Sequence, residues 1–489
     1  MTSSHPPADA SAQATAVDEM LVTGTASSYP IICSAAPANA LTFIELPKFD
    51  LDLYIQNYSG RTRFDRLLLI GKSCVPLQLD ALKAAIAEAK SGRDVSRYKQ
   101  AWDCIRKLAP DEPEATRDEA WIDATEKSNK AETQRLESEL KGYKNNLIKE
   151  SIRMGNEDLG RHFEAIGKLN DATEAYSRMR QDVSTTKHII DCGMHLANVS
   201  LYRRDWNMVL TNIGKITGVQ SPDEEETLQS FVRLLSGIAH LNIGSYLEAA
   251  KNLLLTDFAV PPAQYNHVTS PNDIAIYGGL TALATMDRTE LQRRVLDNQS
   301  FRTFLEHEPH IRKAVSLFVS GRYSNCLSIL ESYRSDYLLD VYLRQHVKDL
   351  YKRIRTKCIV QYFLPFSRIT LESLDAAFGL PGESLEEELM AMIRNDFLNA
   401  RIDARNKLLV AVQPDPRADM QRQSLKAAKK YERDATEHLR RINIISAGLE
   451  VLPGKVEKPG PPDEWFDERA NVALMESMET EESTKVQEA

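Results

Sequence analysis

The chain has 489 residues, 42% hydrophobic and 27% charged, a composition that indicates a folded protein of more than one domain. It contains no run of 18 apolar residues, which argues against a transmembrane helix. The first 47 residues contribute −4 and residues 454–489 contribute −6 to the net charge of −9, so the body carries +1 and no global basic field favours nucleic acid.

The N-terminal region divides into an arm and a helical segment. Residues 1–45 are rich in Ala, Ser, Thr and Pro without helical periodicity, which predicts a disordered arm. Residues 46–125 are predicted to be helical, because apolar side chains recur at three- and four-residue intervals over 61–90. Residues 126–153 predict a long exposed helix, whose thin apolar stripe is Leu136, Leu140, Tyr143 and Leu147.

A weak repeat of small and large residues predicts stacked helix pairs over residues 126–350. Four copies share one frame: Gly160-Phe163-Gly167-Ala172-Tyr176, the looser Ala197-Ser200-Arg204-Val209-Ile213, Gly237-His240-Gly244-Ala249-Leu253, and Ala314-Leu317-Gly321-Cys326-Leu330. The spacing is typical of tetratricopeptide (TPR) helix pairs, in which small residues let two helices approach closely. The intervals of 37, 40 and 77 residues predict a degenerate unit near Tyr277-Gly278-Gly279. We therefore predict a mainly α, TPR-like, right-handed helical-repeat solenoid; unrelated helical hairpins are the alternative.

The pattern changes after residue 350. Three predicted helices, the second capped by Thr370 and the third by Ser384, precede two strand-like runs at 398–403 and 407–412. Helix–helix–helix–hairpin is the order of a winged helix, which we assign to residues 351–412. A long C-terminal bundle helix is predicted for residues 413–452, and a disordered acidic tail for residues 453–489.

Candidate catalytic and metal-binding residues are few. His188, Cys192 and His195 would share a helix face, but a structural zinc site needs a fourth ligand, and packing within a helical repeat is the preferred interpretation. No nucleophile elbow or phosphate-binding glycine loop is present, so we expect no catalytic residue, no cofactor and no metal. The six scattered cysteines form no CxxC pair and indicate free thiols in a reducing compartment.

The predicted winged helix raises the question of DNA binding. Its third helix would be the recognition helix, but residues 383–396 carry a net charge of −4. Such a helix would repel phosphates, so we expect a winged helix that contacts protein.

TPR-like pairs followed by a winged helix resemble the PCI-domain family of the proteasome lid, the COP-nine signalosome and translation initiation factor 3. Several stretches are similar to the signalosome subunit 1 group: residues 57–60, 66–68, 143–153 running into 158–160, 175–178 with 186–190, and Ala400-Arg-Ile-Asp403 with Lys407-Leu408. The resemblance covers about residues 45–450. Residues 182–184 depart from the usual pattern, which indicates a divergent, fungal member.

The resemblance implies a non-catalytic scaffold in a complex that removes a ubiquitin-like protein from cullins. The solenoid would bind partners, including the cullin–RING ligase, in the nucleus and cytoplasm, as part of a hetero-oligomer with other PCI subunits and without DNA or membrane. A proteasome-lid scaffold and a nucleic-acid-binding PCI adaptor are the alternatives. The predicted assembly residues of the wing are Ala400, Arg401, Ile402, Asp403, Lys407, Leu408 and Leu409. Those of the C-terminal helix are Leu425, Ala428, Tyr431, Ala435, Leu439, Ile442 and Leu449.

Overall fold

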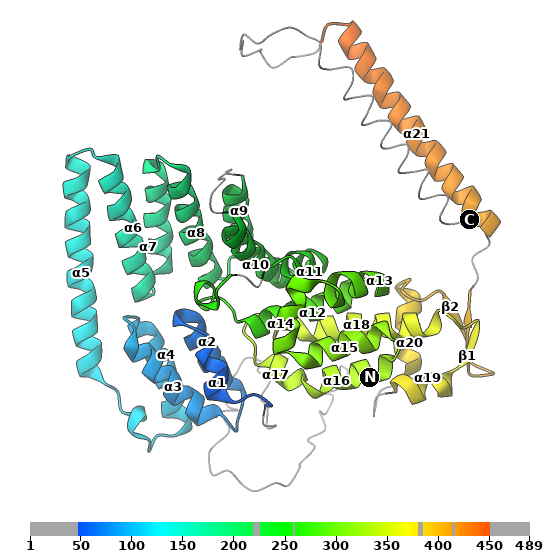
Figure 1. Ribbon diagram of the computed structural model, residues 1–489, viewed down its shortest axis with the longest axis horizontal. Helices are drawn as coiled ribbons and strands as arrows, with labels where there is room; N and C mark the ends of the chain where they lie inside the picture. Colours follow the sequence, from blue (N-terminus) through cyan, green and yellow to red (C-terminus); the bar gives the residue numbers. More distant parts are fainter. Residues whose placement is uncertain (1–46, 219–224, 258–259, 380–384, 413–415, 450–489) are drawn as a thin grey trace, which may run out of the picture. The chain divides into compact units, whose positions relative to one another are not determined.

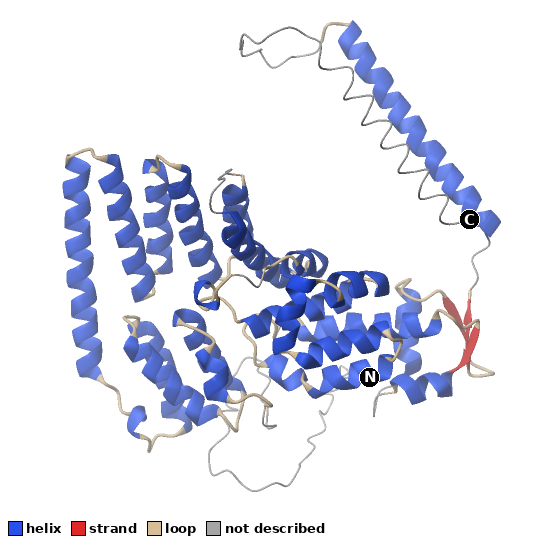
Figure 2. Cartoon of the chain, in the orientation of Figure 1, coloured by secondary structure: helices blue, strands red, loops and turns tan. Residues whose placement is uncertain are grey.

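The computed structural model describes residues 47–218, 225–257, 260–379, 385–412 and 416–449, and it forms two units, residues 1–411 and 412–489 (Figure 1). The fold is mainly α, as predicted (Figure 2). The predicted arm, the acidic tail and the Ser384 cap lie outside the described residues. Within the described part, no helix is long and apolar enough to cross a membrane.

Four helices form an N-terminal block with its own core. They are α1 (Leu51–Gln56), α2 (Gly60–Ser73), α3 (Gln78–Ser91) and α4 (Val95–Leu108), followed by the 3₁₀ turn η1 (Pro113–Ala115). The apolar faces of α2, α3 and α4 meet in a buried cluster that includes Phe64, Leu82 and Ile105. Leu339, which is distant in the sequence, joins the same cluster, so the block is packed against a much later part of the chain.

The repeat region follows, with each helix packed on the next from α5 to α12 (Figure 1). Its first half is α5 (Glu119–Asn145), α6 (Lys149–Ile166), α7 (Leu169–Met179), η2 (Arg180–Asp182), α8 (Thr186–Tyr202), α9 (Trp206–Thr217), α10 (Glu225–Ile243) and α11 (Tyr246–Leu254). Its second half is η3 (Pro262–Gln264), α12 (Pro271–Thr285), α13 (Arg288–Leu291), η4 (Gln292–Leu296), α14 (Gln299–His307), α15 (Pro309–Val319), α16 (Tyr323–Ser332) and α17 (Arg334–Leu338).

The prediction of one long helix over 126–153 is wrong in its extent. The helix begins earlier, at Glu119, and ends at Asn145, and a new helix begins at Lys149. Leu147, placed in the apolar stripe, instead adopts a left-handed conformation with φ of 55° and is exposed. Consecutive asparagines before it favour a turn over helix continuation, so the stripe is limited to the buried Leu136 and Leu140.

The repeat frame has a direct structural basis. A Cβ atom on Gly160 would lie 2.5 Å from the Tyr176 ring, and one on Gly237 would lie 2.6 Å from Leu253, sixteen positions later in each case. The turn residue seven positions after the start has positive φ in all four copies: Gly167, Arg204, Gly244 and Gly321. The second copy looks loose in sequence because an arginine, rather than glycine, occupies this left-handed position.

The degenerate unit predicted near Tyr277 is helix α12. Added Cβ atoms on Gly278 and Gly279 would lie 2.7 Å from Phe301 in α14 and 2.2 Å from Ile311 in α15. The glycine pair therefore lets α12 pack closely against two later helices, which replaces the simple hairpin of the other copies.

The winged helix contains one strand more than predicted. Its elements are α18 (Val347–Phe363), β1 (Arg368–Thr370), α19 (Leu371–Phe378), α20 (Leu385–Arg394), β2 (Ala400–Asp403) and β3 (Leu408–Ala411). The sheet order is β1-β3-β2, and both pairings are antiparallel, with Leu409 opposite Ile369 on one side and Ile402 on the other. Thr370 caps α19 as predicted, by accepting a hydrogen bond from the Ser373 amide.

The described residues of the second unit are Val412, α21 (Pro416–Ser446) and the residues that follow this helix to 449. Pro416 occupies the first turn, where a missing N–H carries no cost.

The left-handed turn position predicts two substitutions with opposite effects on the free energy of unfolding. Gly244→Ala should destabilise the fold by about 1–2 kcal/mol, because an added Cβ meets no atom within 4 Å and only the backbone conformation is penalised. Arg204→Gly should stabilise it by about 0.5 kcal/mol, the relief of that penalty less the greater chain entropy of glycine.

The control is Gly214→Ala, inside α9 and equally open, which should stabilise by about 0.5–1 kcal/mol. Denaturant unfolding followed by circular dichroism measures all three variants. Equal effects of the two Gly→Ala changes would contradict the assignment.

Candidate assembly site

The sheet of the wing has two edge strands, β1 and β2, and of these only β2 contains predicted assembly residues. At the two ends of β3, the Ala411 amide donates to Ser367 O at 2.9 Å, and Lys407 O accepts from the Leu371 amide at 2.9 Å. The backbone N–H and C=O groups of the odd-numbered residues of β3 therefore point toward β1. Backbone groups alternate in direction along a strand, so Leu408 and Val410 face β2 and pair with Asp403 and Arg401. The N–H and C=O of Ile402 therefore point away from the sheet.

This arrangement changes the predicted interface. Leu408 and Leu409 lie in the central strand, and Leu409 is buried between two partners, so neither can offer a free backbone edge. The sequence predicts only two strands in the wing, an arrangement that would leave one edge of each run unpaired, and this prediction is wrong because β1 covers one side of β3. The assembly role of all seven wing residues stays a prediction, and its backbone argument now depends on β2 alone.

Local contacts hold the β2 edge in place. Asp403 accepts hydrogen bonds from the amides of Arg405 and Asn406 and from the Asn406 side chain at 2.8 Å. These bonds lower the pKa of Asp403, the Asn406 side chain contributing most. Ala400 is buried at the other end of the strand, while Phe397, just before it, is 61% exposed. The edge is therefore rigid and has a large apolar side chain beside it.

The C-terminal helix has an apolar stripe without partners in the described residues. Leu425, Tyr431, Leu439 and Ile442 are all exposed, and no side chain of α21 is buried. The prediction that Leu449 belongs to this helix is wrong, because α21 ends at Ser446, and Leu449 is exposed beyond its end. The helix also exposes Met420 and Ile445, which the sequence analysis did not include and which lie along one side of the stripe. An exposed stripe of this length is typical of a surface that binds other helices.

The acidic helix of the wing has a structural explanation. Glu386, Glu387 and Glu388 occupy the first turn of α20, where the helix dipole stabilises negative charge. Glu388 also accepts hydrogen bonds from the Arg355 guanidinium at 2.9 and 3.0 Å. These carboxylates disfavour phosphate contact at the position of a recognition helix.

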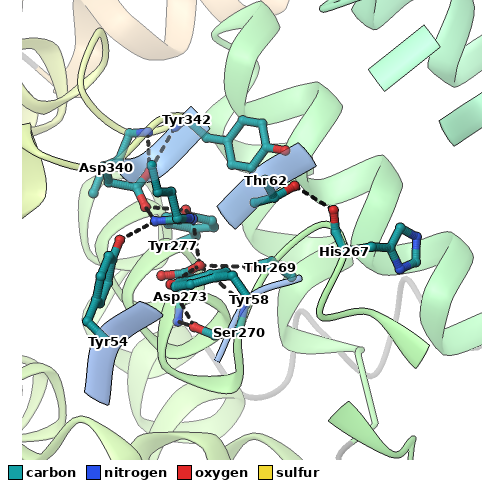
Figure 3. A network of polar contacts seen from close by, with 12 residues as sticks. Tyr54, Tyr58, Thr62, His267, Thr269, Ser270, Asp273, Tyr277, Asp340 and Tyr342 are labelled. Atoms are coloured by element: carbon teal, nitrogen blue, oxygen red, sulfur yellow. Dashed lines mark hydrogen bonds and ion pairs between the residues drawn. The ribbon is translucent and has the colours of Figure 1, made fainter. Parts of the chain in front are cut away.

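A buried ionic network fixes the N-terminal block to the later part of the chain (Figure 3). Arg66 of α2 is fully buried, and its guanidinium lies 2.7 Å from Asp273 and 2.6 Å from Asp340. It also donates to the hydroxyls of Tyr54 and of Tyr277, the latter at 3.2 Å. Residues separated by more than 200 positions therefore share one charged cluster.

The two carboxylates are held by further donors. Asp273 accepts from the Tyr58 hydroxyl at 2.8 Å and forms the capping box of α12 with Ser270. Asp340 accepts from the Tyr277 hydroxyl at 2.6 Å and from two backbone amides at 2.8 Å. Burial raises the pKa of Asp273, and the positive charge of Arg66 acts in the opposite direction.

The three residues considered as zinc ligands have other roles. Cys192 is buried and donates to Tyr176 O at 3.4 Å, His195 stacks on the Tyr176 ring, and His188 lies 3.7 Å from Glu150. Among the described residues, no group of three or more His, Cys, Asp or Glu side chains is arranged to hold a metal ion.

Sequence analysis missed the ionic network. Arg66 was noted only within the stretch 66–68, and Tyr277 only as part of a degenerate repeat. One signal was available: a single arginine stands between Phe64 and Leu67 on a helix whose apolar face is otherwise buried. A charge in that position requires a buried partner, although the pattern cannot say which one.

Comparison with known proteins gives two family matches and consistent relatives. Residues 118–294 match the family of 26S proteasome subunit RPN7, and residues 330–412 match the PCI domain. A protein of Emericella nidulans named COP9 signalosome complex subunit 1 is 49% identical, over 89% of each chain. A Neurospora crassa protein of the same name is 50% identical, over 82% of this chain and 91% of its own. The 26S proteasome regulatory subunit RPN7 of Saccharomyces cerevisiae is 24% identical, over 53% of this chain and 60% of its own.

The network predicts a large cost for removing its cation. Arg66→Met should destabilise the N-terminal block by about 3–5 kcal/mol, because two buried carboxylates lose their counter-charge. The control is Arg63→Met, whose partly exposed ion pair with Glu88 at 3.5 Å should contribute about 0–1 kcal/mol.

Hydrogen exchange of the α2 amides measures both variants within the whole chain. Similar protection in Arg66→Met and Arg63→Met would refute the anchoring role of the network.

Proposed function

Because the chain belongs to the COP9 signalosome complex subunit 1 family, we propose that it is a non-catalytic scaffold subunit of the signalosome. The observation that carries the proposal is the 49% identity to a relative of that name over 89% of both chains. The complex would remove the ubiquitin-like protein Nedd from cullins with a zinc protease in another subunit, as the resemblance implies. The other PCI subunits of the complex are its partners.

Several finer points belong to this proposal. The solenoid binds the cullin–RING ligase, and the chain binds neither DNA nor membrane; the acidic α20 supports the first exclusion. The described free thiols, of which Cys74, Cys192, Cys326 and Cys358 are buried, suit the nucleus and cytoplasm, where thiols stay reduced. A proteasome-lid subunit is the weaker alternative, because that resemblance is lower and covers less of the chain.

The direct test is affinity purification of the tagged chain from its own cells, followed by mass spectrometry. We expect the other signalosome subunits in near-equal amounts, and deneddylation of cullin by the purified complex but not by the isolated chain. Recovery of proteasome-lid subunits instead would overturn the proposal.

The free edge of β2 predicts how the winged helix pairs with its neighbour. Ile402→Pro removes an N–H that points away from the sheet, so the wing should remain folded, whereas strand addition by a partner should weaken at least about tenfold. Ile402→Val keeps the N–H and is the control. Leu409→Pro should instead unfold the wing, since its N–H lies within the sheet.

Reconstitution with the partner subunits, together with circular dichroism of each variant, measures the effect. If folded Ile402→Pro assembled like wild type, pairing through this edge would be excluded.

The stripe of α21 predicts a helical-bundle contact. Leu439→Glu combined with Ile442→Glu should keep the chain folded, because both side chains are already exposed, but it should strongly reduce incorporation into the complex. Gln423→Glu with Lys426→Gln makes the same change of net charge at exposed positions outside the stripe and should assemble normally. The yield of complex in size-exclusion chromatography distinguishes the pairs, and equal yields would contradict a bundle role.

A further inference from the structure

A cavity of about 700 Å³ lies where the N-terminal block meets the repeat helices. Its wall comes from α2, the α3–α4 connection, the end of α6 and the middle of α8. Four arginines line it: Arg61, Arg93, Arg97 and Arg161. No residue of the wing or of α21 lines the cavity, so it is separate from the assembly surfaces described above.

The two inner arginines, Arg61 and Arg97, have few hydrogen-bond acceptors around them. Arg61 and Arg97 approach the same oxygen of Asp94, at 3.1 and 3.3 Å. Arg97 is only 13% exposed, yet within the described residues its guanidinium forms no hydrogen bond and its other carboxylate contact, to Asp65, is 3.5 Å long. Burial, together with the charge of Arg61, lowers the pKa of Arg97 to about 10. One carboxylate oxygen is thus shared by two cations.

The acidic residues of the wall are already engaged. Glu88 pairs with Arg63 at 3.5 Å, and Glu164 accepts from the Tyr176 hydroxyl at 3.1 Å. Asp94 also caps α4 by accepting from Ser96. The outer Arg93 has no ion pair among the described residues, and Arg161 pairs only with Glu157 on its own helix. The wall therefore has more N–H donors than acceptors, and a guanidinium carries five N–H groups.

The cavity is held open by rigid contacts. Gly167, with φ of +89°, brings the α6–α7 turn so close to Asp94 that a Cβ would lie 2.3 Å from its carboxylate. Arg61 donates to Glu164 O at 2.9 Å, which joins α2 to α6. Because these contacts fix Arg61 and Asp94 before any ligand arrives, binding would not have to order these two side chains.

We propose that this cavity binds an acidic segment of a partner polypeptide. Carboxylates supply the missing acceptors for Arg97, Arg93 and Arg161, and guanidinium–carboxylate geometry allows paired hydrogen bonds. The wall between the charges is apolar, with Phe64 and Tyr202, and suits side-chain methylenes.

The test uses the full chain and a short fluorescent peptide with consecutive glutamates, measured by fluorescence anisotropy. We expect binding that weakens with salt and is at least about tenfold stronger than that of the same peptide with glutamines. Arg93→Glu with Arg161→Glu should lower the affinity at least about tenfold without unfolding the chain, since both side chains are exposed.

The matched control is Arg135→Glu with Arg178→Glu, which makes the same change of charge at exposed i,i+4 ion pairs outside the cavity and should change the affinity less than about twofold. An equal loss in both double variants would show non-specific attraction and overturn the proposal. Arginine-dependent binding of inorganic triphosphate without binding of the glutamate peptide would overturn it in favour of a phosphate site.

Discussion

The position of the N-terminal block depends on a charge that water cannot reach. Apolar contacts such as those of Leu339 tolerate small shifts, but a buried guanidinium is costly unless its partners meet it with good geometry. Arg66 has partners from α1, α12 and the segment after α17, so all of them must assemble in one register. The placement of α2 against α6 follows from this, and the arginine-lined cavity with it.

The features that could be predicted from sequence are those whose contacts are local. The repeat frame was found because Gly160 meets Tyr176, and Gly237 meets Leu253, within a single helix pair. Even the loose copy follows the rule, since Arg204 adopts the same turn conformation as the glycines. The ionic network was missed for the opposite reason: Asp273 and Asp340 lie more than 200 residues from Arg66, and no periodicity links them.

The wing shows how one missed strand alters a functional argument. Strand β1 has only three residues, too few for an alternating pattern, and it is defined by its pairing with β3 some forty positions later. Without β1, both runs of the hairpin seem to have a free edge. With it, Leu409 becomes an interior residue, and of the two runs only the one that forms β2, near Phe397, keeps a free outer edge. The two runs have similar strand-like sequences, so only the order of the strands shows which of them lies at the edge of the sheet.

The exposed surfaces of the chain differ in physical kind, and this difference bears on their use. The β2 edge has unpaired backbone groups, and the α21 stripe has exposed apolar side chains. Both kinds of surface favour a partner that covers them permanently. The cavity lined by Arg61 and Arg97 is instead charged, so an occupant would gain in encounter rate and specificity more than in lasting stability. A scaffold needs both kinds: permanent contacts to its own complex and reversible contacts to what the complex acts upon. The cavity beside the N-terminal block, which Arg66 anchors, can make reversible contacts without disturbing the permanent contacts of β2 and α21.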